Sequence, residues 1–338
     1  MEKVNIAIVG ATGAVGEAMR EILEERAFSV DQLFLLASEK SVGMKLGFRD
    51  RSINVHNLSD FDFSQVRIAL FSAGGSISAE YAPKAAAAGC VVIDNTSFFR
   101  RDPAIPLVVP EVNAHRIDDY KASNIIANPN CSTIQMVVAL KPIYDAVGIT
   151  RINVATYQAV SGAGRKGVQE LASQTARLLN GLDVESATFT KQIGFNAIPH
   201  IGNFEDNGYT NEEMKMVWET RKIFEDDDIV VNPTCVRIPV FYGHSEAVHI
   251  ETGQKISPAD VRELLAKAPG VTLMDETKNG GYPTPVPEAA GTDPVFVGRI
   301  REDISHPNGI NLWIVSDNVR KGAALNSIQI AEVLLKQL

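Results

Sequence analysis

The strongest constraint on the fold is a glycine-rich turn, GATGAVG, that lies between a buried strand pattern and a helical pattern. The apolar run VNIAIV precedes the turn, and EAMREILEER follows it with apolar residues at helical spacing. Gly10, Gly13 and Gly16 let the backbone approach a diphosphate, and the helix N-terminus supplies unpaired N–H groups. The order strand, turn, helix predicts a dinucleotide site. The alternative is a tight turn that only packs the helix on the sheet.

The rest of the first 130 residues alternates between strand and helix patterns. Strands are predicted at QLFLLAS, RIALFSAGG, CVVIDN and NIIANP, and an alanine-rich helix over about 78–88. This alternation predicts an α/β chain with a Rossmann-type, doubly wound parallel sheet that binds ligands at the carboxyl ends of its strands. From about Arg151 the strand patterns are longer and alternate, as in RINVATYQAV, VRIPVFYGHSEAVHIE, VFVGRIRE and GINLWIVSD. They predict a second, α+β domain with an antiparallel or mixed sheet, after which KGAALNSIQIAEVLLKQL returns to helix.

Composition excludes several classes of function. The formal charge is −9, from 32 basic and 41 acidic residues, which argues against a nucleic-acid surface or binding to an anionic membrane. No stretch reaches the roughly 18 apolar residues of a membrane helix, and the N-terminus has no signal-peptide pattern. Three scattered cysteines are too few for a disulfide framework or a zinc site, so we expect no metal and a cytoplasmic location.

The loop after the second predicted strand bears on the choice of dinucleotide. NAD sites usually end this strand in an acidic residue that faces the ribose 2′-hydroxyl. Ser38, Lys40 and Ser41 instead offer hydroxyls and a cation, which suit a 2′-phosphate. Glu39 is a contrary sign, and its side chain would have to point away. We therefore expect NADP, with a solvated loop as the alternative interpretation.

Cys131 follows the chain-breaking sequence NPN and opens a helical pattern. A thiol needs help to act as a nucleophile at neutral pH, and the N-terminus of a helix supplies part of it, because its dipole and its N–H groups favour the anion. The same N–H groups can hold an oxyanion. The alternative is a buried, inert cysteine, which is our interpretation of Cys90, whereas Cys235 stays ambiguous.

A histidine is the expected partner of such a thiol. His244 follows Gly243 at a turn, and Arg237 lies seven residues earlier on the strand pattern that leads to it. Read alone, His244 is more simply a structural histidine. Four others stand in polar, loop-like text and are interpreted as surface residues: His56, His115, His200 and His306.

Together, six motifs resemble one family nearly end to end: GATGAVG, NPNCST, TYQAVSGAG, EEMKMVWETRKI, CVRIPVFYGHSEAV and SDNVRKGAALNSIQIAE. The chain is similar to the aspartate-β-semialdehyde dehydrogenases, and the combination is more specific than any single motif. The resemblance implies reduction of L-aspartyl-4-phosphate with NADPH to the semialdehyde, with release of phosphate. That reaction serves lysine, threonine, methionine and diaminopimelate synthesis.

The resemblance also implies roles for single residues. Cys131 becomes the nucleophile, His244 the general acid/base and Gln158 the residue that orients the acyl-enzyme intermediate. Arg237 pairs with the substrate α-carboxylate, which suits a planar guanidinium fork, and Glu212 pairs with the amino group. The remaining substrate contacts are Asn130 and the phosphate-binding Arg100 and Lys215, with Arg101 as the alternative to Arg100.

Two of these roles rest on the resemblance rather than on the residues alone. Glu212 and Lys215 stand three apart on a helical pattern, so that both can face one site, but such a pair is more often solvated. For Asn318 the resemblance implies a place near the nicotinamide, and the alternative is a helix cap. The cofactor residues, from motif and resemblance together, are Gly10, Thr12, Gly13, Ala14, Val15, Ser38, Lys40, Ser41, Ser72, Ala73, Gly74, Ser161, Gly162 and Asn318.

For the organisation of the chain we expect an NADP-binding domain formed by residues 1–131 and 318–338 and a catalytic and dimerisation domain over 132–317. The resemblance implies a homodimer or a tetramer. N-acetyl-γ-glutamyl-phosphate reductase shares the chemistry, but an acetylated substrate does not need an acid at Glu212. Glyceraldehyde-3-phosphate dehydrogenase fits the motifs poorly. A non-catalytic relative that only keeps the fold is a further alternative, against which Cys131, Gln158, Arg237 and His244 are all present.

Overall fold

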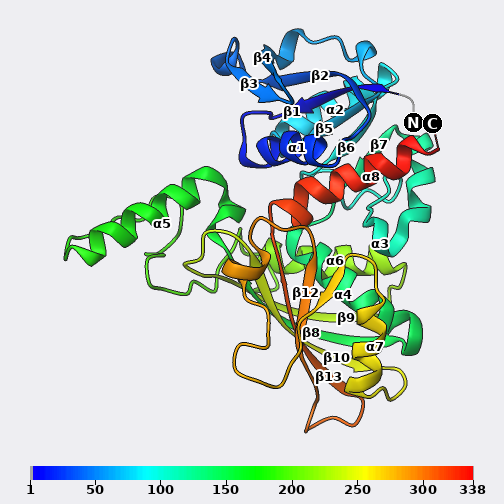
Figure 1. Cartoon of the computed structure of the whole chain (residues 1–338), viewed down its shortest axis with the longest axis vertical. Coiled ribbons are helices and arrows are strands. Elements are labelled where there is room, and N and C mark those ends of the chain that lie inside the picture. Colours follow the sequence, from blue (N-terminus) through cyan, green and yellow to red (C-terminus); the bar gives the residue numbers. More distant parts are fainter. Residues whose placement is uncertain (1–2, 338) are drawn as a thin grey trace. The chain divides into compact units, whose positions relative to one another are not determined.

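The computed structural model describes residues 3–337, and the chain divides into two compact units (Figure 1). The first unit contains the chain through Asn130 and the segment from Ala323 on, and the second runs from Cys131 to Gly322. These junctions lie close to those expected from the sequence, at 131 and 318. The first unit is therefore built from two separate stretches of the chain.

The first unit is organised around a seven-stranded sheet in the order β3-β4-β2-β1-β5-β6-β7. All neighbours pair in parallel except β3, which is antiparallel to β4. Apart from β3 this is the doubly wound order of dinucleotide-binding sheets, so the predicted fold class is confirmed. The strands are β1 (Val4–Val9), β2 (Val30–Ala37), β3 (Lys45–Phe48), β4 (Arg51–Asn57), β5 (Ile68–Phe71), β6 (Val91–Asp94) and β7 (Ile125–Ala127).

The hairpin of β3 and β4 corrects the sequence prediction, which contained neither strand and expected a wholly parallel sheet. Both strands are short, and β4 exposes most of its side chains, so the apolar pattern that marks a buried strand is weak there. The hairpin turns at Arg49, which has a φ of 50°. Strand β4 still pairs in parallel with β2 and completes the doubly wound order.

Four α-helices belong to this unit: α1 (Ala14–Glu25), α2 (Gly75–Ala87), α3 (Pro110–Asn113) and α8 (Leu325–Leu335). Helix α2 begins three residues before the predicted start, after Gly74, whose φ of 101° only glycine adopts readily. The C-terminal helix α8 packs on α1, and the Arg26 guanidinium pairs with the Glu332 carboxylate at 2.7 Å.

A network of buried asparagines joins α8 to the carboxyl ends of β6 and β7. The Asn326 amide donates to the Asn128 side-chain oxygen at 2.7 Å and to the Val108 carbonyl at 3.0 Å. The Asn128 amide in turn donates to the Asn95 side-chain oxygen at 3.0 Å. Buried amides need such partners, and the network fixes the chain just before it enters the second unit.

The second unit has a six-stranded sheet in the order β11-β12-β13-β10-β8-β9. Pairs β8–β9 and β11–β12 are parallel and the others are antiparallel, so the sheet is mixed, as predicted. Helix α4 contacts α6, α7 and four strands of the sheet, whereas Figure 1 shows α5 extending away from it. The elements are α4 (Cys131–Val147), β8 (Ile149–Gln158), α5 (Gly164–Leu179), α6 (Asn211–Phe224), β9 (Val230–Arg237), β10 (His244–Thr252), α7 (Pro258–Ala266), β11 (Val271–Leu273), β12 (Val295–Glu302) and β13 (Gly309–Ser316).

The stretch VRIPVFYGHSEAVHIE, which reads as one strand pattern, forms the end of one strand and most of another. Strand β9 ends at Arg237 and β10 begins at His244. Pro239 lacks the N–H that a strand interior needs, and Gly243 has a φ of 90°, so these residues break the pattern. The break brings the two ends, with Arg237 and His244, to the same edge of the sheet.

We expect Asn326→Ala to lower the free energy of unfolding by about 1–3 kcal/mol, because it leaves the Asn128 oxygen and the Val108 carbonyl buried without their donor. Urea unfolding followed by circular dichroism measures the loss. Gln329→Ala on the same helix is the control, since Gln329 is only half-buried and its change should stay near 0.5 kcal/mol or below. Equal losses for both variants would contradict the structural role of the network.

Candidate active site

Cys131 is the first residue of α4, as predicted, and it is half-buried. The other two cysteines are buried in the interior. Burial raises the pKa of Cys90 to about 12 and also raises the pKa of Cys235 well above its usual value. Both shifts disfavour the thiolate at neutral pH, and Cys131 is therefore the stronger candidate for the nucleophile.

Three buried polar side chains stand at neighbouring strand ends in the second unit. Gln158 ends β8, Arg237 ends the parallel strand β9 directly opposite it, and His244 begins the antiparallel strand β10. The three are 1%, 6% and 0% exposed. The sheet topology therefore brings these three residues together at adjacent strand ends, although they lie up to 86 positions apart in the sequence (158 to 244).

The orientation of His244 is set by the backbone of the residue after Gln158. The Ala159 N–H donates to His244 Nδ1 at 3.0 Å, so this nitrogen is unprotonated and the neutral ring carries its proton on Nε2. Nε2 is buried and has no hydrogen-bond partner among the described residues. Burial lowers the pKa of His244 to about 3, with Arg237 acting in the same direction and Glu212 opposing it. The ring is thus a neutral hydrogen-bond donor.

Arg237 is fixed beside His244 by its own contacts. Its Nη1 donates to the Ala159 carbonyl at 2.6 Å, and its guanidinium lies over the Phe189 ring with 6.0 Å to the ring centroid. Burial lowers the pKa of Arg237, whereas the nearby Glu212 and Cys131 raise it. Cys131, Arg237 and Glu212 therefore interact electrostatically within one site.

Helix α6 places Glu212 and Lys215 in this site. The helix begins with a capping box, in which the Thr210 hydroxyl accepts from the Glu213 N–H and the Glu213 carboxylate accepts from the Thr210 N–H. Glu212 is 7% exposed, and its carboxylate pairs with Lys215 Nζ at 2.9 Å. The sequence alone favours a solvated surface pair at these positions, but in the structure Glu212 is buried.

The loop after β8 and the segment after β13 meet above these residues. The Asn318 amide donates to the Ser161 hydroxyl at 2.9 Å, and its oxygen accepts from the Gly243 N–H at 2.9 Å. Asn318 therefore holds the turn that precedes His244, and the cap at this position is Asp317, which accepts from the N–H groups of residues 319 and 320. A Cβ on Gly162 would lie 2.8 Å from Arg237 Nη1, so Gly162 covers the arginine.

Gly322 belongs to the site and was missed by the sequence analysis. A Cβ at this position would lie 2.8 Å from the Cys131 Cβ, closer than real Cβ atoms approach. Only glycine leaves room for Cys131 at the start of α4. The residue lies inside the motif SDNVRKGAA, but the motif gives no sign that its glycine packs on the cysteine.

Arg100, the expected phosphate ligand, lies in the first unit and is 8% exposed. Its Nε donates to the Asn128 carbonyl and its Nη2 to the Asn95 carbonyl, each at 2.8 Å. Arg101 is exposed, and Asn130 is buried. Arg100 is thus anchored at the carboxyl ends of β6 and β7 by the same segment that carries the asparagine network.

The glycine-rich turn of the first unit borders a cleft of about 520 Å³. Gly10 has a φ of 89°, and a Cβ there would lie 2.9 Å from the backbone of Ser72, so only glycine fits this turn. Six of the predicted cofactor residues line the cleft: Gly10, Thr12, Gly13, Ser38, Ser72 and Ala73. The turn, the cleft and the start of α1 together fit the diphosphate of a dinucleotide.

The cleft corrects one expectation and adds residues. Glu39 lines the cleft rather than pointing away from it, whereas Lys40 is exposed on the short 3₁₀ helix that follows β2 and does not line it. The predicted residues Ala14, Val15, Ser41 and Gly74 do not line it either. Sequence reasoning missed Ala37, Asn57, Leu58, Ser59, Ile77 and Tyr81; Asn57 ends the unpredicted strand β4, and Leu58 and Ser59 follow it.

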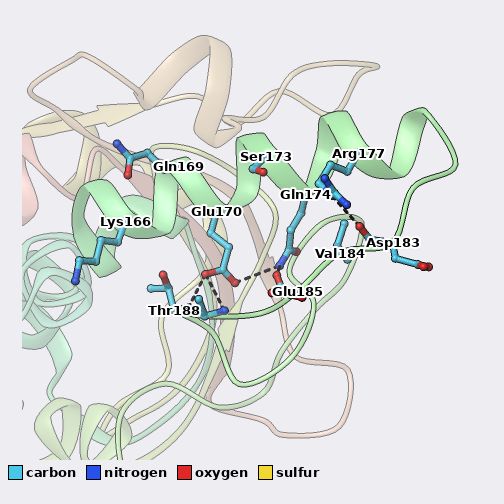
Figure 2. Close-up of a pocket in the computed structure, with 11 residues that line it drawn as sticks. Lys166, Gln169, Glu170, Ser173, Gln174, Arg177, Asp183, Val184, Glu185 and Thr188 are labelled. Carbon is cyan, nitrogen blue, oxygen red and sulfur yellow. Dashed lines mark hydrogen bonds between the residues drawn. The ribbon is translucent and has the colours of Figure 1, made fainter.

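A second hollow, of about 680 Å³, lies between α5 and the segment 183–188 in the second unit (Figure 2). Figure 2 shows the helix side chains reaching this segment: Gln174 donates to the Glu185 carbonyl and Arg177 to the Asp183 carbonyl. The Glu170 carboxylate accepts from the N–H of Thr188. The polar groups of the hollow hold the segment against α5, and no predicted site residue lines it.

Within residues 3–337, no group of three or more His, Cys, Asp or Glu side chains is arranged to hold a metal ion. Over the same residues, no helix combines the length and the apolar character needed to cross a membrane.

The chain matches two family models, the NAD binding domain of semialdehyde dehydrogenase over residues 5–120 and its dimerisation domain over 140–321. A Legionella pneumophila protein named aspartate-semialdehyde dehydrogenase is 63% identical over 98% of this chain and 96% of its own length. Aspartate semialdehyde dehydrogenase II of Vibrio cholerae, solved in complex with ASA, is 62% identical with a TM-score of 0.98 and 99% of both chains covered. A Candida albicans enzyme of the same name, solved with NADP, is 25% identical with a TM-score of 0.78 and 98% of both chains covered.

We expect Gly322→Ala to slow the alkylation of Cys131 by iodoacetamide by roughly tenfold or more, because the new methyl group displaces the start of α4. Mass spectrometry of the labelled peptide follows the reaction. Gly75→Ala is the matched control, since a Cβ there meets no atom within 4 Å and its φ is not positive. Equal alkylation rates in both variants would contradict the packing of Gly322 on the nucleophile.

The buried His244 should make stability depend on pH. Its pKa is 6.5 when unfolded and about 3 when folded, so between these values the unfolded chain binds a proton that the folded chain does not. The free energy of unfolding is unaffected by the titration of this residue above pH 6.5. It decreases as the pH falls below that value, by at most about 1.4 kcal/mol per pH unit. His244→Gln should flatten this slope in urea unfolding between pH 6.5 and 4.5, and the exposed His56→Gln should not. An unchanged slope in His244→Gln would show that the ring titrates normally.

Proposed function

We propose a function from one premise: the chain belongs to the aspartate-semialdehyde dehydrogenase family. It reduces L-aspartyl-4-phosphate with NADPH to L-aspartate-4-semialdehyde and phosphate, reversibly, in lysine, threonine, methionine and diaminopimelate synthesis. The observation that carries this assignment is the convergence, within one unit, of a helix-opening thiol with an arginine, a glutamate and a neutral histidine: Cys131, Arg237, Glu212 and His244.

The substrate is bound through its three charged groups. Arg237, which the Ala159 carbonyl holds in place, pairs with the α-carboxylate, and the buried Glu212 carboxylate pairs with the free amino group. Lys215 and Arg100 bind the phosphate, and Asn130 is a further contact. Lys215 is already paired with Glu212, so amino group and lysine share one carboxylate, and this couples recognition of the two ends of the substrate.

The first chemical step is attack by Cys131 on the acyl carbon. The N–H groups at the start of α4 and the His244 Nε2–H donate to the oxygen as charge develops on it. Phosphate leaves with the electron pair of the broken C–O bond, and a thioester on Cys131 remains. Gln158, whose amide also contacts the Thr156 hydroxyl at 3.3 Å, holds the thioester carbonyl in place.

The second step reduces the thioester. Bound NADPH supplies the hydride for this carbon. His244 again donates to the carbonyl oxygen, and the hemithioacetal collapses to the aldehyde with return of the electron pair to the Cys131 sulfur. Collapse needs a hydrogen bond rather than a full proton transfer, so the neutral His244 is sufficient as a donor. To act as a base through Nδ1, His244 would have to lose the hydrogen bond that Nδ1 accepts from the Ala159 N–H.

The cofactor is held by the cleft of the first unit. The diphosphate lies on the turn of Gly10, Thr12 and Gly13 at the start of α1, with Ala14 and Val15 in its first helical turn. The remaining contacts are Ser38, Lys40, Ser41, Ser72, Ala73, Gly74, Ser161, Gly162 and Asn318. Lys40 approaches the 2′-phosphate from outside the cleft, since Glu39 occupies its wall.

The two units divide these tasks, the first as NADP-binding domain and the second as catalytic and dimerisation domain. The match of residues 140–321 to a dimerisation domain supports a homodimer, and a tetramer remains the alternative assembly. A cytoplasmic location follows from the metabolic role.

N-acetyl-γ-glutamyl-phosphate reductase is the competing enzyme. Its acetylated substrate has no cationic amino group, and the buried Glu212 carboxylate beside the site would then face an amide without reason. A non-catalytic relative would have no need for a neutral, fully buried histidine opposite a half-buried thiol.

The deciding experiment follows NADPH formation from aspartate semialdehyde in the presence of phosphate, with N-acetylglutamate semialdehyde and NAD as comparisons. We expect phosphate-dependent activity with the first aldehyde and NADP. Cys131→Ser should lose at least about 1,000-fold in kcat and still bind NADPH, because the nucleophile is gone and the cofactor cleft is intact. Activity with only the acetylated aldehyde, or substantial activity of Cys131→Ser, would overturn the proposal.

A further inference from the structure

Glu246 is a fully buried carboxylic acid for which the reaction has no assigned use. It lies on β10 two residues after His244, so that both side chains point to the same face of the sheet. Its neighbour across the strand pair is Thr156 on β8, whose own neighbour on β9 is Cys235. Burial of a carboxyl without a compensating group is costly, so a function must retain it.

Gln135 is a buried polar side chain that acts on the Glu246 carboxyl from helix α4, which packs on β10. It lies on α4 four residues after Cys131, and it is 1% exposed. Both polar atoms of Gln135 and both oxygens of Glu246 are buried, and none of the four has a hydrogen-bond partner within the described chain. Of all neighbouring groups, the Gln135 amide is the one that lowers the pKa of Glu246, against burial, which raises it well above its usual value.

We propose that Glu246, acting through Gln135, is a positioning residue that sets the placement of Cys131 relative to His244. The inference rests on the proposed function. A carboxyl and an amide can form two hydrogen bonds side by side, in which the O–H and the N–H each meet a carbonyl oxygen. This pair joins α4 one turn beyond the nucleophile to β10 two residues beyond the histidine.

The arrangement requires the carboxyl to be protonated. A carboxylate could accept only one hydrogen bond from the amide, and it would leave a buried negative charge facing the Gln135 oxygen. Among residues 3–337, no cation contributes to the shifted pKa of the Glu246 carboxyl, and its titratable neighbour Cys235 is itself a neutral thiol, because burial raises the pKa of that residue too. A neutral, hydrogen-bonded pair would satisfy all four buried polar atoms at once.

The test uses three variants and a control. Glu246→Gln keeps a group that can pair with Gln135, Glu246→Leu removes it, and Gln135→Leu with Glu246→Leu replaces both partners by apolar side chains. Thr220→Val is the control, since the Thr220 hydroxyl on α6 is likewise fully buried and has no hydrogen-bond partner in the part of the chain that the structure describes. The measurements are kcat and KM for aspartate semialdehyde, the alkylation rate of Cys131, and the urea midpoint.

We expect Glu246→Leu to lower kcat and the alkylation rate by about tenfold or more with KM changed by less than about threefold, because Arg237 and Glu212 are untouched. Glu246→Gln should keep kcat, KM and the alkylation rate within about twofold of the parent. The double variant should regain the urea midpoint, since no polar atom is left unpaired, and yet stay as slow as Glu246→Leu. Thr220→Val should leave kcat unchanged.

A double variant that recovers both stability and rate would overturn the proposal, because the pair would then only fill space. So would a Glu246→Gln variant as slow as Glu246→Leu. If the parent protein lacks activity on aspartate semialdehyde, the proposed function fails, but the alkylation rates still decide the positioning role. If Glu246→Leu does not fold, the comparison of Glu246→Gln with the double variant remains decisive.

The protonation state has its own readout. A folded-state pKa raised above the unfolded value means that stability is lost as the pH rises past the unfolded value, since the folded chain must keep a proton that the unfolded chain releases. Glu246→Gln avoids this cost, so its urea midpoint should exceed that of the parent by an amount that grows from pH 6 to pH 8. A gain that stays constant or shrinks would show a charged Glu246.

Discussion

The arrangement of the second unit depends on how one face of its sheet buries polar groups. Strands β8, β9 and β10 present Gln158, Arg237, His244 and Glu246 to helices α4 and α6, and each is less than one-tenth exposed. A sheet face of this kind is stable only where nearly every polar atom has a partner. Ala159 satisfies two of these residues at once, with its N–H on His244 and its carbonyl on Arg237.

The first unit also pairs its buried polar groups, at the carboxyl ends of β6 and β7. Asn326, Asn128 and Asn95 fix the end of β7, and the Arg100 guanidinium adds two bonds to the neighbouring carbonyls. These bonds fix the backbone of the first unit up to Asn128. The C-terminal helix, which supplies Asn326, therefore helps to fix the end of β7 within the first unit.

The sequence predicted the parts of this molecule that have a strong local signal. The turn around Gly10 and the helix start at Cys131 are short motifs with a defined backbone, and the structure has both. The hairpin β3–β4 was missed because its exposed strands carry no apolar pattern. Two other features could not be predicted for a different reason: the approach of Gly322 to Cys131 and that of Gln135 to Glu246. Only the fold brings these residues together, and no spacing along the chain marks them.

The charges of the site also explain why its histidine is neutral. Arg237 lies beside His244 and lowers the pKa of the ring, while Glu212 balances the arginine and is itself shared with Lys215. A protonated His244 would add a third cation to a buried site with one carboxylate, at a high desolvation cost. The site therefore stabilises anions through fixed guanidinium, ammonium and N–H groups, and it leaves the imidazole as a donor whose strength does not change across the neutral pH range.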